Sequence, residues 1–164
     1  MNYTRTEENY LKAIYGLESK FGKEVSTNKL ANKLKTKASS VTDMVKKLDK
    51  KELITYEKYK GVSLTDLGKN IAITIIRNHR IWEVFLVEKL GYKWDEVHEI
   101  AEQLEHIKSD ELVDRLDDFL EHPSFDPHGD PIPDKEGNIP VRKEAISLSE
   151  LKKGESGIIV GVKN

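Results

Sequence analysis

The residues best suited to chemistry lie in the stretch His98-Glu-Ile-Ala-Glu-Gln-Leu-Glu-His106. If this stretch is helical, one stripe carries four of them at positions i, i+4, i+7 and i+8, namely His98, Glu102, Glu105 and His106. Two imidazoles and two carboxylates on one face form a ligand set for a divalent cation. The alternative interpretation is a solvated acidic face with two incidental histidines.

The composition restricts the classes of protein that this chain can represent. Its 164 residues are 34% charged and 37% hydrophobic, enough for one good-sized domain or two small ones. Apolar runs fall short of the roughly 18 residues of a membrane span, and the N-terminus lacks the apolar core of a signal peptide. The absence of cysteine excludes disulfides and thiolate ligands. We therefore expect a cytoplasmic protein without membrane contact.

The net charge of −2 hides two segments of opposite charge. From Lys20 to Lys60 there are twelve lysines and five acidic residues, a net charge of +7. From Glu83 to His122 there are thirteen acidic and four basic residues, a net charge of −9. A basic first half indicates a polyanionic partner and an acidic middle indicates cations, although two differently solvated surfaces would look similar.

The elements before residue 65 fit a winged helix-turn-helix. A first helix is expected over 6–20 with Thr6 as its N-cap, a short second helix begins after Ser26, and a third runs from Ser39 or Ser40 to about Lys51. The turn between the second and third helices lacks the usual glycine. Strands over 53–57 and 62–65 then form the wing.

The candidate DNA contacts are polar side chains of the third helix and nearby lysines. A solubilising surface charge is the alternative role for each individual lysine. Few of these side chains suit bidentate reading of bases, so we expect much of the specificity to come from DNA shape and apolar contacts. Facing the groove we expect Ser39, Ser40, Thr42 and Asp43, and on phosphates Lys37, Lys46, Lys47, Lys58 and Lys60.

The remaining elements carry the candidate ligands. A long helix is expected over 66–90, and its broad apolar surface suggests a dimer interface. Further helices are expected over 94–108 and 110–121, followed by a proline-rich loop over 122–140. The tail, with expected strands near 146–148 and 158–160, looks like the first strands of a small barrel that it is too short to close.

These features together resemble the diphtheria-toxin-repressor family of metal-dependent transcriptional regulators. The resemblance covers about residues 6–140 and includes the loop Asp126-Pro-His-Gly-Asp-Pro-Ile-Pro133. It implies a mainly α fold, with a winged helix-turn-helix (1–72), a metal-binding and dimerisation domain (73–140), and a linker with an incomplete SH3-like β segment (141–164). It also implies a homodimer that binds double-stranded operator DNA.

The resemblance assigns a primary metal site to Glu102, Glu105 and His106, with Asn9 at the position of the first-helix ligand. Manganese-type members have glutamate where this chain has Glu102, and iron-type members have cysteine. Asn9 offers an amide carbonyl without charge. Lys12 stands where some manganese-type members add a glutamate, which argues against their closely spaced metal pair at that site.

The resemblance places a second metal site on His79, Glu83 and His98. Some manganese-type members instead join the Glu83 position to a Cys-Pro-His loop, which here reads Asp126-Pro-His128. All of these donors are oxygen or imidazole nitrogen, which favours Mn²⁺, with Fe²⁺ next. Zn²⁺, Co²⁺ and Ni²⁺ should still bind in vitro, because intrinsic affinity rises along the series toward copper.

Other classes of function fit less well. The zinc-peptidase pattern His-Glu-Xaa-Xaa-His fails because Glu102 stands where the second histidine is needed, and the Glu-Xaa-Xaa-His pattern of di-iron bundles fails at Gln103. We therefore expect a metal-activated repressor rather than an enzyme. A winged-helix regulator gated by a small organic ligand is the first alternative, and a metal-storage protein or metal-dependent enzyme is the second.

Overall fold

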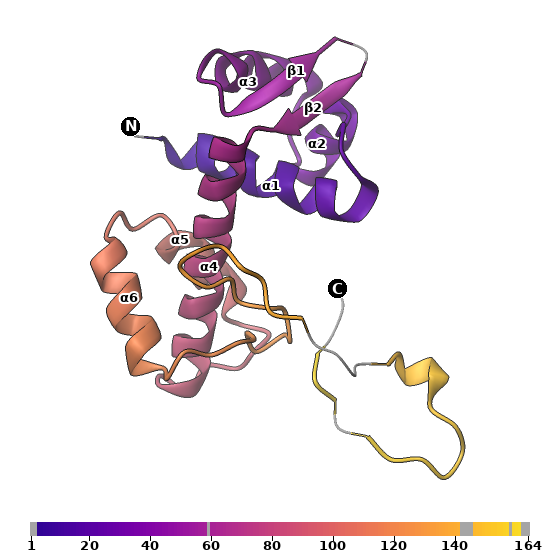
Figure 1. Ribbon diagram of the computed structural model, residues 1–164, viewed down its shortest axis with the longest axis vertical. Coiled ribbons are helices and arrows are strands. Elements are labelled where there is room, and N and C mark those ends of the chain that lie inside the picture. Colours follow the sequence, from indigo (N-terminus) through magenta and orange to yellow (C-terminus); the bar gives the residue numbers. More distant parts are fainter. Residues whose placement is uncertain (1–2, 59, 142–145, 158, 162–164) are drawn as a thin grey trace. The chain divides into compact units, whose positions relative to one another are not determined.

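The computed structural model describes residues 3–58, 60–141, 146–157 and 159–161. The chain divides into two compact units, Met1–Ile75 and Ile76–Asn164. The long helix α4, Asp66–Glu88, begins in the first unit and ends in the second (Figure 1). Among the described residues, no helix combines the length and the apolar character needed to cross a bilayer.

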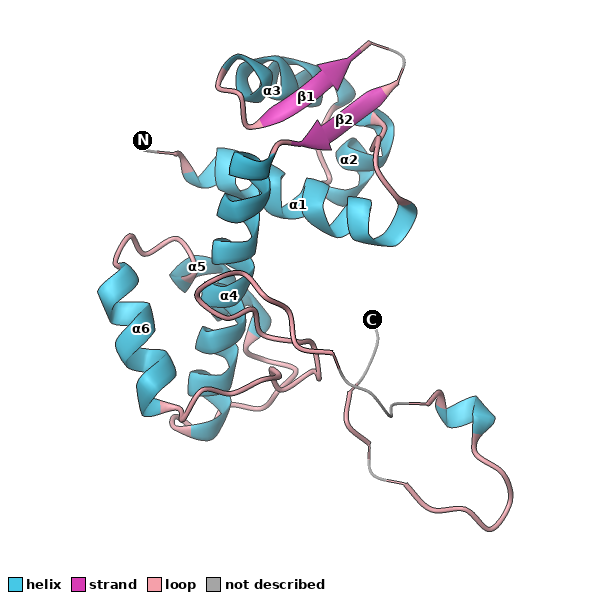
Figure 2. Cartoon of the chain, viewed as in Figure 1, coloured by secondary structure: helices cyan, strands magenta, loops and turns pink. Residues whose placement is uncertain are grey.

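The first unit is the expected winged helix-turn-helix (Figure 2). The hairpin strands pair antiparallel, with Ile54 opposite Leu64. Val25, in the connection after the first helix, exchanges backbone hydrogen bonds of 2.8 and 2.9 Å with Val62, which joins this connection to the wing. The elements are α1 (Arg5–Phe21), α2 (Thr27–Lys33), α3 (Ala38–Lys50), β1 (Ile54–Glu57) and β2 (Gly61–Leu64).

Apolar residues at helical spacing build the core of this unit. Leu11 and Ile14 of α1 are fully buried, as are Val41, Val45 and Leu48 of α3. Because these α3 residues face inward, the opposite face of α3 is left to polar and charged side chains. The core thus determines which face of α3 can meet a partner.

Two helix starts differ from the sequence-based expectation. The N-cap of α1 is Thr4, not Thr6, because Thr4 and Glu7 form a reciprocal capping box. Helix α3 begins at Ala38 rather than at a serine, and its N-cap Lys37 makes no side-chain capping bond. The turn before α3 manages without glycine because Lys35 adopts a φ of 49°.

The second unit contains the C-terminal part of α4 with α5 (His98–Leu104) and α6 (Asp110–Phe119). The helix expected over 94–108 is therefore wrong at both ends. Residues 94–97 form a turn and a bend, and α5 ends at Leu104, followed by a turn at 105–106 and by Ser109, which is extended and caps α6. Glu105 nevertheless has φ −58° and ψ −21°, so it continues the direction of the last helical turn.

The tail also differs from expectation. The strand expected near 146–148 is not formed: residues 146–147 have no regular secondary structure, and Leu148–Glu150 form a short 3-10 helix capped by Ser147. Residues 159–161 are not a strand, and residue 158 of the second expected strand lies outside the described residues. Serine and glutamate spaced as in a capping box favour this helical turn over an extended conformation.

Candidate metal centre

The centre is organised around the carboxylate of Glu83, which is 1% exposed. Helix α4 supplies both His79 and Glu83, one turn apart, and α5 supplies His98 from its first residue. Oε1 of Glu83 lies 3.0 Å from Nε2 of His79 and 3.4 Å from Nδ1 of His98. These three donors lie within 4.8 Å of one another, as a metal site requires.

A second set of donors reaches the same carboxylate from the loop after α6. Oε2 of Glu83 lies 3.5 Å from Nδ1 of His128, which in turn lies 4.0 Å from Oδ1 of Asp126. Glu83, Asp126 and His128 also offer ligand atoms within 4.8 Å of one another. We call the five residues His79, Glu83, His98, Asp126 and His128 the Glu83 cluster.

The Glu83 cluster holds its central carboxylate ionised. Burial would raise the pKa of Glu83, but hydrogen bonds from His79 and His98 and the charges of His79 and His128 outweigh it and lower the pKa to about 2. The opposite holds for Asp126, whose pKa is raised by burial and by the nearby charges of Glu83 and Asp130. Two buried carboxylates close together make the centre attractive to a cation.

Glu105 and His106 lie beside this cluster rather than apart from it. Oε2 of Glu105 lies 2.6 Å from Nδ1 of His79, and its Oε1 lies 3.4 Å from Nε2 of His106. Glu102 is half exposed, and its carboxylate lies 3.5 Å from Nε2 of His98. The two metal sites expected separately from the sequence are therefore joined by contacts between side chains.

Arg80 is a residue of this centre to which the sequence pattern assigned no role. Its guanidinium donates to the carbonyl of Pro131 and lies 3.6 Å from Asp126 and 3.7 Å from Asp130. Asp126 in turn accepts 2.9 Å hydrogen bonds from the backbone N–H groups of His128 and Asp130. A basic residue beside His79, together with two aspartates in the loop, was the signal that could have revealed this contact.

Asn9, the remaining expected ligand, belongs to α1 in the first unit and is half-buried. The other eight candidate ligands all belong to the second unit.

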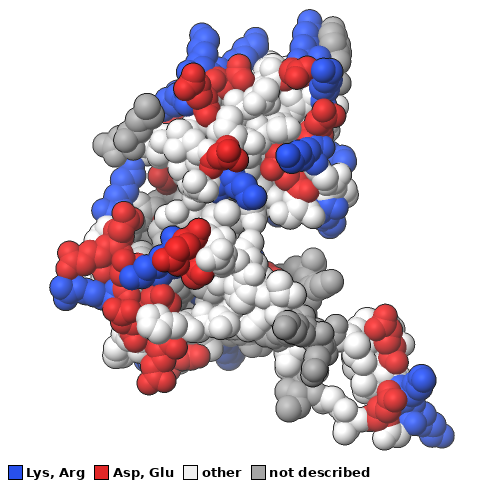
Figure 3. Space-filling view, in the orientation of Figure 1, with Lys and Arg blue, Asp and Glu red and all other residues white. Residues whose placement is uncertain are grey.

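Acidic side chains gather over α6 in the second unit (Figure 3), where Asp110 and Glu111 occupy the first turn.

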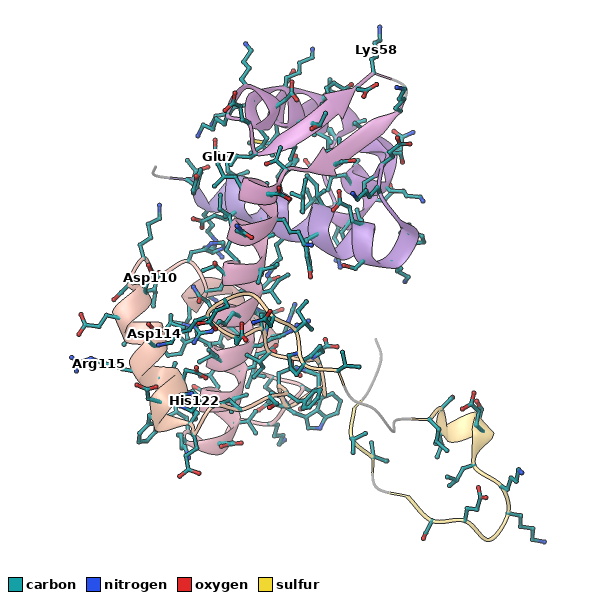
Figure 4. The ribbon with its side chains drawn as sticks, viewed as in Figure 1. Glu7, Lys58, Asp110, Asp114, Arg115 and His122 are labelled. Atoms are coloured by element: carbon teal, nitrogen blue, oxygen red, sulfur yellow. The ribbon has the colours of Figure 1, made fainter. Side chains whose placement is uncertain are left out.

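The candidate DNA contacts of α3 lie on its exposed side. Ser39, Ser40, Asp43 and Lys46 are exposed, as are Lys37, Lys58 and Lys60 outside the helix. Lys58 projects from the tip of the hairpin (Figure 4). Thr42 donates its hydroxyl to the carbonyl of Ala38, so part of its hydrogen-bonding capacity is used within the helix.

Two of the candidate lysines already pair with glutamates. Nζ of Lys47 lies 3.1 Å from the fully buried carboxylate of Glu7, and Nζ of Lys60 lies 2.6 Å from Glu57. Because the Lys60 pair is exposed, it competes little with a phosphate. The Glu7 carboxylate is inaccessible to water, so Lys47 has an internal role that its position in the sequence did not suggest.

Comparison with known proteins matches the first part of the chain to a DNA-binding domain and the second part to a metal-binding and dimerisation domain. Residues 2–62 match the model of the iron-dependent repressor N-terminal DNA-binding domain. Residues 65–134 match the model of the iron-dependent repressor metal-binding and dimerisation domain. Together the two matches cover most of the chain.

Individual relatives support the same family assignment. An HTH-type transcriptional regulator of Methanocaldococcus jannaschii is 40% identical over 114 residues, which cover 70% of this chain and 91% of the relative. The iron-dependent repressor IdeR of Mycobacterium tuberculosis is 34% identical over 128 residues, 78% of this chain but only 55% of IdeR. The chain thus spans about half the length of IdeR.

A solved structure described as a manganese-dependent transcriptional repressor in complex with manganese superposes with a TM-score of 0.82 at 39% identity. The superposition covers 96% of this chain and 72% of that one. The mainly helical fold with its winged helix-turn-helix is therefore confirmed. On the family models, the relatives and this shared fold, the chain belongs to the iron-dependent repressor family of metal-dependent transcriptional regulators.

Proposed function

We propose that this protein is a cytoplasmic, homodimeric repressor of metal-ion homeostasis that binds operator DNA when Mn²⁺ or Fe²⁺ occupies its second unit. The observation that carries this proposal is the Glu83 cluster, in which a buried, ionised carboxylate is surrounded by imidazoles and a second buried carboxylate. Three histidines and two carboxylates without sulfur suit Mn²⁺ or Fe²⁺, and Zn²⁺, Co²⁺ and Ni²⁺ are expected to bind in vitro.

The residues beside the cluster have proposed roles too. Glu102, Glu105 and His106 are proposed as primary-site ligands, and Asn9 as a further donor on the basis of the family resemblance alone. A bound cation would supply positive charge that offsets the repulsion between Glu102 and Glu105. Glu105 also contacts His79, so ordering of either site is expected to influence the other.

On the DNA side, we propose that α3 enters the major groove and that the lysines around it and on the wing contact phosphates. Support comes from the exposure of Ser39, Ser40, Asp43 and Lys46 on the face opposite the buried side of α3. Lys46→Ala should weaken binding to all sequences alike and lower the slope of log affinity against log salt by about 1. A loss restricted to one DNA sequence would instead make Lys46 a base-reading residue.

The experiment that tests the proposed function measures binding to DNA upstream of the protein's own gene, first with chelator and then with added Mn²⁺, Fe²⁺ or Zn²⁺. We expect Mn²⁺ or Fe²⁺ to raise DNA affinity at least tenfold, which corresponds to about 1.4 kcal/mol of coupling. Glu105→Gln should reduce this metal effect, with Glu99→Gln, an exposed change in the first turn of α5, as its matched control.

Three outcomes would contradict the proposal. DNA affinity that is high with or without metal, and unchanged in His106→Ala, would favour a regulator gated by a small organic ligand. Unchanged metal dependence in Glu105→Gln would overturn the role given to that carboxylate. Failure to bind DNA under any condition, together with catalytic turnover, would favour a metal-dependent enzyme.

A further inference from the structure

We propose that Glu83 bridges two divalent cations held side by side, one by His79 and His98 and the other by Asp126 and His128. This inference rests on the proposed metal-binding function and concerns the number of ions in the Glu83 cluster. It differs from the two interpretations of the sequence, in which Glu83 belongs either to one set of partners or to the other.

The two oxygens of the Glu83 carboxylate face different partners. Oε1 is 3.0 Å from Nε2 of His79 and 3.4 Å from Nδ1 of His98, whereas Oε2 is 3.5 Å from Nδ1 of His128. A carboxylate that offers one oxygen to each of two donor sets has the geometry of a bridging ligand. In proteins with paired metal ions, the two ions lie roughly 3.5–4 Å apart, a spacing that one carboxylate can span.

The donors form two groups of three rather than one group of five. Within the described residues, His79, Glu83 and His98 satisfy the 4.8 Å limit on ligand separation, and so do Glu83, Asp126 and His128. Glu83 is the member common to both groups. The groups also come from different elements, since α4 and α5 supply the first and the loop after α6 supplies the rest of the second.

Each histidine of the buried part of the cluster is held in place by a neighbour. Nδ1 of His79 is 2.6 Å from Glu105, which leaves Nε2 directed at Glu83. The ring of His128 meets the ring of Trp94 edge to face at 5.6 Å. Partners that orient ligating side chains in this way are typical of metal sites. His98, whose side chain is 60% exposed, gives the cluster an edge open to solvent.

The experiment counts bound Mn²⁺ per chain by equilibrium dialysis of the full chain, at a free concentration that just saturates the wild type. His98→Ala removes a donor from one group, and His128→Ala removes a donor from the other. We expect each single variant to lose one ion and the double variant to lose two. His122→Ala is the matched control, because His122 is an exposed histidine of the same unit that contacts Asp117 and Asp118 outside the cluster.

A single shared ion predicts a different pattern: each single variant and the double variant would then lose the same one ion. That result would overturn the proposal, as would a His128→Ala variant that loses none. Electron paramagnetic resonance of the wild type provides a second readout, since two bridged Mn²⁺ ions broaden each other's signal and either single variant should restore the six-line spectrum of an isolated ion. A six-line spectrum alone in the saturated wild type would contradict the pairing.

These outcomes are independent of the test of the proposed function, because the dialysis contains no DNA. If metal fails to affect DNA affinity while the double variant loses two ions, the repressor proposal fails and the paired centre stands. If metal activates DNA binding while His98→Ala, His128→Ala and the double variant each lose one ion, the repressor proposal stands and the paired centre fails.

Discussion

Two buried glutamates, one in each unit, show how the same side chain serves different purposes. Glu7 in α1 and Glu83 in α4 are both at most 1% exposed, and the pKa of each is lowered to about 2. Oε1 of Glu7 pairs with the ammonium groups of Lys51 at 2.7 Å and Lys47 at 3.1 Å. Glu83 is instead surrounded by imidazoles.

The difference lies in what neutralises the buried charge. Lysine carries a permanent positive charge at neutral pH, so Glu7 is compensated within the fold and has no need of an ion. Imidazole is a common metal ligand whose nitrogen can bind either a proton or a metal ion, so a bound cation can take over the compensation of the Glu83 charge. We therefore expect a buried carboxylate among histidines to bind a cation, and one between lysines to stabilise the fold.

The largest expected effect tests this contrast with metal. At a Mn²⁺ concentration 100 times the dissociation constant, each ion bound at the Glu83 cluster should add about 2.7 kcal/mol to the free energy of unfolding. Urea unfolding with Mn²⁺ and with chelator should show that Glu83→Gln loses this increment. Glu7→Gln should keep it. If Mn²⁺ raised the free energy of unfolding equally in the wild type and in Glu83→Gln, the ion would bind elsewhere.

The next largest effect is the pH dependence of stability that arises because lysines compensate the charge of Glu7. Burial opposes ionisation of Glu7, but hydrogen bonds from Lys51, the backbone of Thr4 and Lys47 lower its pKa from 4.5 to about 2. Its stabilising contribution is therefore complete above pH 4.5 and is lost as the pH falls toward 2.

In metal-free protein at pH 7, Glu7→Gln should lower the free energy of unfolding by about 2 kcal/mol, less than the full pKa shift implies because water screens the partly exposed lysines. The gap between the variant and the wild type should close as the pH approaches 2. Glu83 titrates over the same range but is present in both proteins, so its effect cancels. A gap of the same size at pH 2.5 and pH 7 would contradict this account.

The smallest effect concerns an intermediate case, Asp117 of α6. This buried carboxylate is 2.9 Å from the guanidinium of Arg77 and 3.3 Å from Nδ1 of His122. Because Arg77 supplies a permanent charge, His122→Ala should change the free energy of unfolding by less than about 1 kcal/mol, as measured by urea unfolding. A loss above about 2 kcal/mol would show that the histidine, not Arg77, compensates Asp117.

Local patterns in the sequence predicted much of the fold. The hairpin and the three helices before it were expected within a few residues of their actual bounds, because apolar spacing and turn residues act locally. Thr4 was missed as the N-cap of α1 because Thr6 is also a capping residue, and only the Glu7 side chain selects between them. The domain boundaries at 72 and 140 remain predictions.

The candidate site was predicted in its residues but not in its arrangement. Spacing placed His79 with Glu83 on one helix face, and the resemblance supplied the loop donors. Neither indicated that Glu105 would contact His79, because that contact depends on where α5 ends and how it packs against α4. The helix expected over 94–108 failed for a related reason, since no glycine or proline marks its end in the sequence.

The contacts of Arg80 have a kinetic consequence. Because its guanidinium holds the carbonyl of Pro131 and lies close to Asp126 and Asp130, the geometry of the loop is set by the protein itself. No segment of the loop then has to fold when an ion arrives. The rate at which an ion enters the centre past the exposed ring of His98 should therefore be limited by loss of water from its hydration shell. A chelator should remove the ion without unfolding the loop.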